Sequence, residues 1–307
     1  MSPGPVSDRP VGSGPVIAGV DGGAHSADAL ALGRWAAGIL EVPLVVAVVS
    51  PAASAIGSGR VDAEWIADRR AAADRVLDGA RAALGDPPGV EYQVLASSSA
   101  AHGLHDLAEH RDAALLVVGS GAAAPASRLF PGSTAERLLA GSVCPVAVAP
   151  AGMTRSAAEA PAGESRVGGR IGVAYVDTPD GRAALESAAR LARRTGDPLL
   201  LVTVVARGDA ARPFLLGSDA ERAFLDTARE TYEEALRKAA ASVPDVTVEW
   251  TLRSGDVVET LAELTDVDVL FCGSRGYGPA RRVLLGGVSG RLLRRARRPL
   301  IVVPRAA

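Results

Sequence analysis

The chain repeats itself at a nearly fixed distance, and this internal repeat limits its possible folds more than any other feature. The segments Ala114–Ser120 and Asp268–Ser274 are both apolar runs that end in Gly-Ser, and they lie 154 residues apart. The segments Pro145–Pro150 and Pro299–Pro304 show the same distance. Near the start of each copy the distance is 155 residues. The chain therefore consists of two copies of one folding unit, not of a single larger domain.

Two domains of ordinary size fit the 307 residues, because single domains usually hold about 100–200 residues. Residues 1–14 are rich in proline and glycine, and we predict a disordered tail there. Residues 151–169 lack an apolar period and are rich in small and charged residues, which is typical of a linker. We expect a first domain over residues 15–150 and a second over residues 170–307.

Within each copy, apolar runs alternate with amphipathic stretches. The apolar runs are nearly continuous, which indicates parallel strands that are covered on both faces. We therefore predict the α/β class, with two tandem doubly wound domains, each a five-stranded parallel sheet with helices on both faces. In the first copy the predicted strands are residues 16–21, 44–49, 90–96, 115–119 and 145–149, and the predicted helices are residues 26–40, 61–84, 101–111 and 133–140. Ligands of such sheets bind at the carboxyl ends of the strands, where the glycine-rich segments fall.

Composition argues against several classes of protein. The formal net charge is −2, so no strong field draws the chain to nucleic acid or to a membrane surface. No apolar run reaches the roughly 18 residues of a membrane-spanning helix, and the first residues lack the apolar stretch of a signal peptide. We expect Cys144 and Cys272 to be buried small hydrophobes, which fits a reducing cytoplasm.

For two clusters of polar residues we favour a solvated helix surface over a binding site. His102, His105 and His110 lie close together, but the second copy has no equivalent, so we predict a solvated helix face and no metal site. The end of the second copy is basic, and without interleaved aromatic residues it favours a solvated helix end over nucleic acid binding. An anionic partner for these arginines stays open. They are Arg281, Arg282, Arg291, Arg294, Arg295, Arg297 and Arg298.

A glycine-rich loop follows the fourth predicted strand of the second copy. It reads Gly273-Ser-Arg-Gly276, then nine residues, then Gly286-Gly287-Val288-Ser289. Glycines without a Cβ let the backbone approach a ligand closely. The helix that begins near Val288 offers free N–H groups and its dipole to a phosphate, and Ser289 adds a hydroxyl in the first turn.

This pattern resembles the ATP-binding motif of the universal stress protein family, and the resemblance covers nearly all of both copies. It implies an adenine nucleotide alpha hydrolase-like fold and an internal pseudo-dimer in which the last strands of the two domains pair. It also implies a cytoplasmic stress-response role with ATP, with or without Mg²⁺, as effector. In ATP-binding members an Asp at the end of the first strand contacts the nucleoside, and a backbone group at the end of the second strand, here near Val49 or Val204, would contact the adenine.

The first copy keeps the acid and the hydroxyls of the motif. Its expected nucleotide-binding residues are Asp21, Gly22, Val49, Gly119, Ala122, Gly132, Ser133 and Thr134. Ala122 replaces the second motif glycine, and an alanine costs about 1 kcal/mol or more where φ is positive. Gly23 stands where the family often has Ser. We favour the first copy as the working site.

The second copy keeps the glycine spacing but not the acid. Its candidate residues are Val204, Gly273, Gly276, Gly286, Gly287 and Ser289. Gly287 replaces the usual Ser or Thr, and Val176 stands at the place of the acid. Asp177 follows one residue later, where its side chain would start from the opposite face of the strand.

Three functions stay open from the sequence. The first is a regulator that binds an adenine nucleotide and signals through an unidentified protein partner. The second is a slow ATPase or adenylate-handling enzyme, for which Arg128 and Arg275 are the only nearby cations and no catalytic residue is predicted. The third is a structural protein whose pockets have decayed. Further assembly to a homodimer also stays open.

Overall fold

The computed structural model describes residues 13–52, 59–125, 128–154, 169–206, 218–274 and 287–304. Residues 1–12 of the predicted tail, most of the linker and residues 275–286 of the second copy lie outside these residues. Gly14, at the end of the predicted tail, donates its N–H to the carbonyl of Asp112 over 3.0 Å. Among the described residues, no helix is both long and apolar enough to cross a membrane.

Strands and helices alternate in each copy, as the apolar runs predict. The first copy contains β1 (Val16–Gly19), α1 (Ser26–Leu40), β2 (Leu44–Pro51), α2 (Gly59–Leu84), β3 (Val90–Ser97), α3 (Ala100–His110), β4 (Leu115–Gly119), α4 (Ser133–Gly141) and β5 (Val146–Ala149). The second contains β6 (Ile171–Ala174), α6 (Pro179–Thr195), β7 (Leu199–Ala206), α7 (Ser218–Ala241), β8 (Val248–Gly255), α8 (Val257–Ala262), β9 (Val269–Gly273), α9 (Gly287–Leu292) and β10 (Leu300–Val303).

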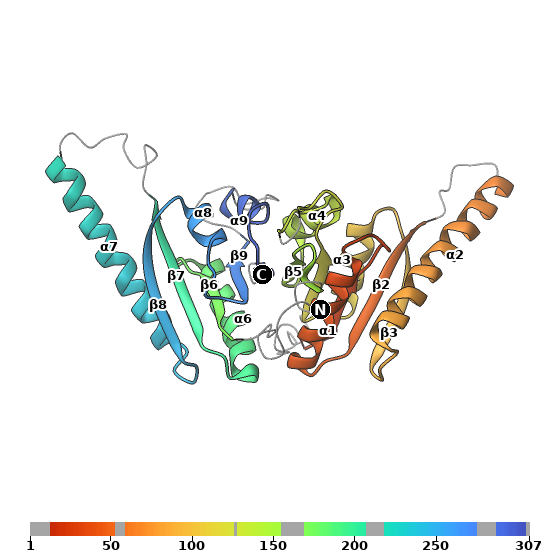
Figure 1. Ribbon diagram of the computed structural model, residues 1–307, viewed down its shortest axis with the longest axis horizontal. Helices are drawn as coiled ribbons and strands as arrows, with labels where there is room; N and C mark the ends of the chain where they lie inside the picture. Colours follow the sequence, from red (N-terminus) through yellow and green to blue (C-terminus); the bar gives the residue numbers. More distant parts are fainter. Residues whose placement is uncertain are drawn as a thin grey trace, which may run out of the picture.

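The strands of both copies form one ten-stranded sheet in the order β3-β2-β1-β4-β5-β10-β9-β6-β7-β8. All pairs within a copy are parallel, whereas β5 and β10 pair antiparallel at the junction, with Ile301 opposite Ala147. This pairing, which the resemblance implied, hides two sheet edges that would otherwise be open. The two halves splay apart from the junction, with α2 and α7 at the outer ends (Figure 1).

Helices cover both faces of the sheet, so the molecule has three layers. One aliphatic core lies under α1, α2, α6 and α7, and the other lies under α3, α4, α8 and α9. Each core runs across the junction between the copies, because residues of both copies belong to it. The predicted α/β class with two tandem doubly wound domains is confirmed.

Contacts outside the sheet also join the two halves. Arg294 after α9 donates to Glu136 of α4 over 2.9 Å, and the N–H of Leu129 donates to the carbonyl of Ala296 over 2.8 Å. On the other face, Arg194 at the end of α6 donates to Glu41 after α1 over 2.7 Å. The halves therefore meet through a sheet and through both helical layers.

Candidate nucleotide site

A cavity of about 270 Å³ lies at the carboxyl ends of β1 and β4 in the first copy. The chain runs from β1 to β2 on one side, and β4 pairs with β1 on the other, so this is the switch point of the sheet. The lining residues are Gly19, Val20, Asp21, Gly23, Ala24, His25, Ser26, Ala47, Val49, Ala100, Leu104, Val118, Gly119, Ser120, Gly121, Ala122, Gly132, Ser133, Thr134 and Ala135. All predicted site residues of the first copy except Gly22 are among them.

The acid of the motif organises the turn that enters α1. Oδ1 of Asp21 accepts the N–H of Gly23 over 2.7 Å and the hydroxyl of Ser26 over 2.9 Å. The Ser26 hydroxyl in turn accepts the N–H groups of Asp21 and Gly22. Because Asp21 is exposed and only Oδ1 takes part in these bonds, Oδ2 is free to face a ligand in the cavity.

Gly22 shapes this turn from outside the cavity. Its φ of 76° lies in the left-handed region, and a Cβ there would approach the side chain of Val76 on α2 to 2.8 Å. It therefore faces α2 and not the space in which a nucleotide would lie. A glycine at this position is required by the backbone, which separates it from residues that would touch a ligand.

The loop after β4 needs glycine at positions other than the one the motif suggests. Positive φ among the described non-glycine residues occurs at Glu41, Asp86 and Asp112, so Ala122 carries no such strain. A Cβ on Gly119 would lie 2.5 Å from the carbonyl oxygen of His25, which is too close for any side chain. Gly121 was not among the predicted nucleotide-binding residues, although a Cβ there would lie 3.1 Å from Gly132.

The amino end of α4 faces the same cavity. Gly132 is its N-cap residue and, having no side chain, leaves the first N–H groups of the helix without a side-chain cap among the described residues. Ser133 and Thr134 add hydroxyls in the first turn, and both line the cavity. This arrangement suits an anion such as a phosphate, because free N–H groups and the helix dipole converge there.

The opposite wall is apolar. Val49 and Ala47 of β2 line it together with Leu104 of α3 and Val118 of β4. Val49 is half-buried, whereas Leu104 and Val118 are buried. An apolar wall beside strand backbone suits a flat aromatic base.

Two residues beside the cavity were missed from the sequence. His25 ends the turn before α1 and lines the cavity, with Nδ1 3.4 Å from Oδ2 of Asp28. Asp28 is 2 % exposed and accepts the N–H of Gly152 and the N–H and hydroxyl of Thr154, at 2.8 to 3.0 Å. It thereby holds the start of the linker against α1. A partner 124 residues away leaves no local signal in the sequence.

The second copy arranges the same region differently. Gly276 and Gly286 lie outside the described residues, and Val204 is half-buried on β7. The hydroxyl of Ser289 donates to the carbonyl of Gly273 over 2.9 Å, so it is bonded within the protein. Gly287 is exposed at the start of α9, which is a helix of six residues.

The turn before α6 carries a different charge pattern. Val176 takes the place of Asp21, and the Asp177 carboxylate pairs with Arg182 on α6. The hydroxyl of Tyr175 lies 3.4 Å from the same carboxylate, and burial together with that charge raises the pKa of Tyr175 to about 12. The polar partners of the Asp177 carboxylate are thus Arg182 and Tyr175, both close to it in the chain.

The remaining candidate residues are the two cysteines, the histidines of α3 and the arginines of the basic cluster. Cys144 and Cys272 are buried free thiols, and burial raises their pKa to about 11 and about 12. Within the described part of the chain no three potential ligands cluster for a metal, and His102 is exposed beside Asp106. Of the basic cluster, Arg294 and Arg295 pair with Glu136 and Glu259, while Arg281 and Arg282 lie outside the described residues.

The sequence model of the universal stress protein family matches residues 13–150 and 169–304. The chain belongs to the universal stress protein family. A universal stress protein of Mycobacterium tuberculosis strain H37Rv is 31% identical over 256 residues, which cover 80% of this chain and 84% of the relative. The match of this universal stress protein to its relative therefore extends over most of both chains.

Solved structures support the fold alone. A universal stress protein from Archaeoglobus fulgidus superposes with a TM-score of 0.64 at 19% identity, covering 96% of this chain and 98% of that one. A putative universal stress protein from Pseudomonas aeruginosa superposes with a TM-score of 0.59 at 13% identity, covering 94% and 92%. Both matches span the two copies together, so the paired arrangement is shared.

Proposed function

We propose that this universal stress protein is a cytoplasmic stress-response regulator that binds ATP, or a related adenine nucleotide, in the cavity of its first copy. The observation that carries the proposal is the pairing of an exposed carboxylate, Asp21, with the amino end of α4 across one cavity at the switch point of the sheet. A nucleoside hydroxyl and a phosphate are the groups these two ends would hold.

Each wall of the cavity has a role in this proposal. The Asp21 carboxylate would accept the ribose hydroxyls, and the amino end of α4 with Ser133 and Thr134 would take the phosphates. The base would lie against Val49 and Leu104, near the backbone of β2. The volume of about 270 Å³ is close to the lower limit of small-molecule sites, so it suits the nucleoside, while distal phosphates extend outward along α4.

Regulation would follow from partner binding in one of two states. A nucleotide shifts such an equilibrium only if its affinity differs between the states. The Asp28 contact offers a physical route, because Asp28 lies beside His25 of the cavity and holds the start of the linker. A nucleotide that moves the His25 turn would therefore act on the linker, and a protein partner would sense the change.

Release and counting of the bound molecule tests the proposal most directly. Freshly purified protein is denatured by heat, and the released small molecules are identified by mass spectrometry, alongside a calorimetric titration with ATP and Mg²⁺. We expect an adenine nucleotide at about one per chain, or binding with that stoichiometry. No released nucleotide together with no binding at millimolar ATP would contradict the proposal and favour the scaffold alternative.

A further inference from the structure

A second cavity, of about 470 Å³, lies where the two halves of the molecule meet. It is formed by α1 and the strand starts of the first copy, and by α6, β9 and β10 of the second. It is separate from the candidate nucleotide site, which lies at the opposite, carboxyl ends of the first-copy strands. Its volume falls within the range of small-molecule sites.

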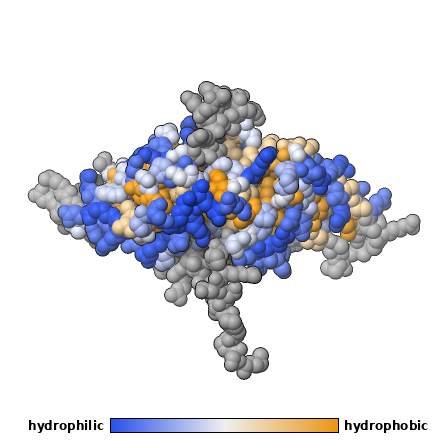
Figure 2. All heavy atoms as spheres, turned by 90° about the horizontal axis from the view of Figure 1, so that it is seen from below, coloured by the Kyte–Doolittle hydropathy of each residue, from blue (hydrophilic) through white to orange (hydrophobic). Residues whose placement is uncertain are grey.

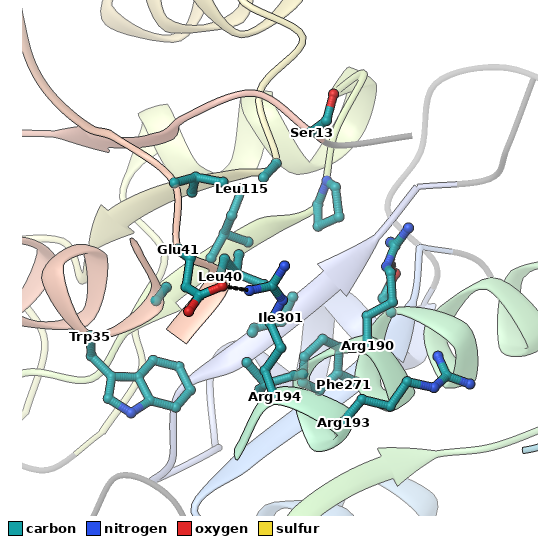
Figure 3. A pocket seen from close by; sticks show the side chains of 16 residues that line it. Ser13, Trp35, Leu40, Glu41, Leu115, Arg190, Arg193, Arg194, Phe271 and Ile301 are labelled. Carbon is teal, nitrogen blue, oxygen red and sulfur yellow. Dashed lines mark hydrogen bonds and ion pairs between the residues drawn. The ribbon is translucent and has the colours of Figure 1, made fainter. Parts of the chain in front are cut away.

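The floor and one wall of this junction cavity are apolar. Trp35 and Leu40 of α1 form the wall, while Leu115, Phe271 and Ile301 from three strands form the floor. Leu115, Phe271 and Ile301 are buried beneath it. Figure 3 shows the indole of Trp35 at the left of the view, with Ile301 and Phe271 nearer its middle. On the surface seen from below, apolar side chains gather between polar ones near the middle of the molecule (Figure 2).

The other wall is cationic and comes from α6. Arg190, Arg193 and Arg194 line the cavity, and among the described residues Glu41 is the one acidic residue of the lining. Arg193 also forms an ion pair with Asp245, outside the cavity lining. Arg194 stands in the middle of the opening in Figure 3, where its Nη1 donates to Glu41 over 2.7 Å. Both side chains of this pair are well exposed, at 44% and 78%, so it contributes little to stability. A guanidinium has five donors, so Arg194 has further capacity for an anion beside Glu41.

The two walls occupy equivalent positions of the repeat. At a distance of 155 residues, Trp35 corresponds to Arg190, and both line the cavity. Arg194 corresponds to the aliphatic Ile39, which lies on α1 beside the lining residue Leu40. The same helical surface is therefore aromatic and aliphatic in one copy and basic in the other. If the cavity were only a gap at the seam of two like domains, its two walls would be chemically alike. The divergence instead gives it an apolar side and a cationic side.

We propose that the junction cavity binds an amphipathic monoanion, a small carboxylate with an apolar body. The body would lie between Trp35 and the floor of Phe271 and Ile301, where burial removes apolar surface from water. The carboxylate would lie at Arg194, whose planar guanidinium matches a carboxylate in geometry. A ligand there would touch both copies, so its binding would also oppose movement of one half against the other.

The test uses the full chain and decanoate as the probe, below the concentration at which it forms micelles. Binding is measured by calorimetry and by tryptophan fluorescence, because Trp35 lines the cavity while Trp65 and Trp250 are 48% and 37% exposed. We expect saturable binding at one decanoate per chain, and a fluorescence change that disappears in Trp35→Phe. Decanol, which has no charge, should bind at least tenfold more weakly.

A matched pair of variants locates the head group. Arg194→Gln should weaken decanoate binding about tenfold or more, because one charge-assisted contact is lost. Arg229→Gln breaks a comparable exposed pair, with Glu233 on α7, and should leave binding unchanged. Asp21→Ala should also leave decanoate binding unchanged, so failure of this site and failure of the nucleotide site are distinguishable. Absence of saturable binding, equal binding of decanol, or equal effects of the two arginine variants would each overturn the proposal.

Discussion

The turn after the first strand differs between the two copies, although the sheet around it is the same. In the first copy residues 21–25 form a turn outside the helix, and α1 begins at Ser26. In the second, α6 begins at Pro179, which corresponds to position 24 of the first copy, and Thr178 caps it by accepting the N–H of Gly181. The helix therefore starts two residues earlier and occupies part of the turn.

The charges at this turn differ as well. The backbone of His25 lies against Gly119 in the first copy, and Asp180 occupies the corresponding place against Gly273 in the second. Asp180 is 6% exposed and lies in the first turn of α6. The second copy thus has a buried acidic residue at the place where the first copy has a histidine that lines the cavity. The two copies share one architecture and differ in the length and the charge of this turn.

The largest expected effect concerns how each copy holds the linker. Asp28→Ala removes the acceptor of three hydrogen bonds from Gly152 and Thr154 in a buried place. We expect a loss of about 3 kcal/mol in the free energy of unfolding, and a Tm lower by about 6–12 °C in a thermal melt.

Asp268→Ala at the other end of the linker is the control for this variant. Asp268 accepts one bond, from the N–H of Arg170 over 3.1 Å, and its loss should cost about 1 kcal/mol. If both variants lower the Tm equally, the buried hydrogen bonds of Asp28 do not stabilise the protein more than the single bond of Asp268. The proposal that Asp28 couples the cavity to the linker would then lose its support.

The second effect concerns the nucleoside end of the two sites. Asp21→Ala and Gly132→Val should each weaken ATP binding at least tenfold in a calorimetric titration, about 1.4 kcal/mol, since one removes the acid and the other fills the mouth of the cavity. Val176→Ala changes the equivalent place in the second copy and should have no effect. Loss of ATP binding in Val176→Ala with intact binding in Asp21→Ala would mean that the nucleotide site lies in the second copy.

Sequence patterns predicted the fold well where the cause is local. The helix over 26–40 and the strand over 115–119 have the predicted bounds, because turn residues and apolar runs mark them directly. The first strand was predicted to reach residue 21 but ends at Gly19, since the turn bonds of Asp21 draw the chain out of the sheet. An apolar run thus shows that a strand exists more reliably than where it ends.

The candidate site was predictable in its motif and not in its neighbours. Asp21 and Gly132 could be found because their spacing repeats a pattern, but the burial of Asp28 depends on Thr154, far along the chain. The motif spacing suggested that Ala122 would have a strained, positive φ, but its φ is not positive. The backbone conformation at Ala122 depends on the loop around it, which the motif spacing does not describe. The junction cavity depends on how α1 packs beside α6, which no single segment encodes.

The third effect compares the buried thiols of the two copies. Burial raises the pKa of Cys144 to about 11 and of Cys272 to about 12, above an unfolded value of about 8.5. The folded state therefore holds these protons to higher pH than the unfolded state does. The stabilisation is complete below about pH 8.5 and is lost as the pH rises through 9 to 11.

Urea unfolding at pH 8, 8.75 and 9.5 measures this loss, which should be about 1 kcal/mol per thiol over that range. Cys144→Ala and Cys272→Ala change the packing at every pH, so only the difference in slope against the unsubstituted protein is compared. Each variant should show a flatter dependence, and the contribution of Cys272 should continue to higher pH. Unchanged slopes in both would mean that the thiols ionise in the folded state as readily as in the unfolded state.

The smallest expected effect tests the electrostatic part of the comparison between the two turns. His25→Asp gives the first copy the carboxylate that the second has at Asp180, and it should weaken ATP binding about threefold to fivefold at low salt through repulsion of the phosphates. His25→Gln, which carries no charge, is the matched control and should bind within a factor of two of the unsubstituted protein. Because mobile ions screen the repulsion, the deficit of the Asp variant should shrink between low and high salt. An equal loss in both variants, independent of salt, would mean that His25 acts by shape, and it would remove charge as a reason to place the nucleotide in the first copy.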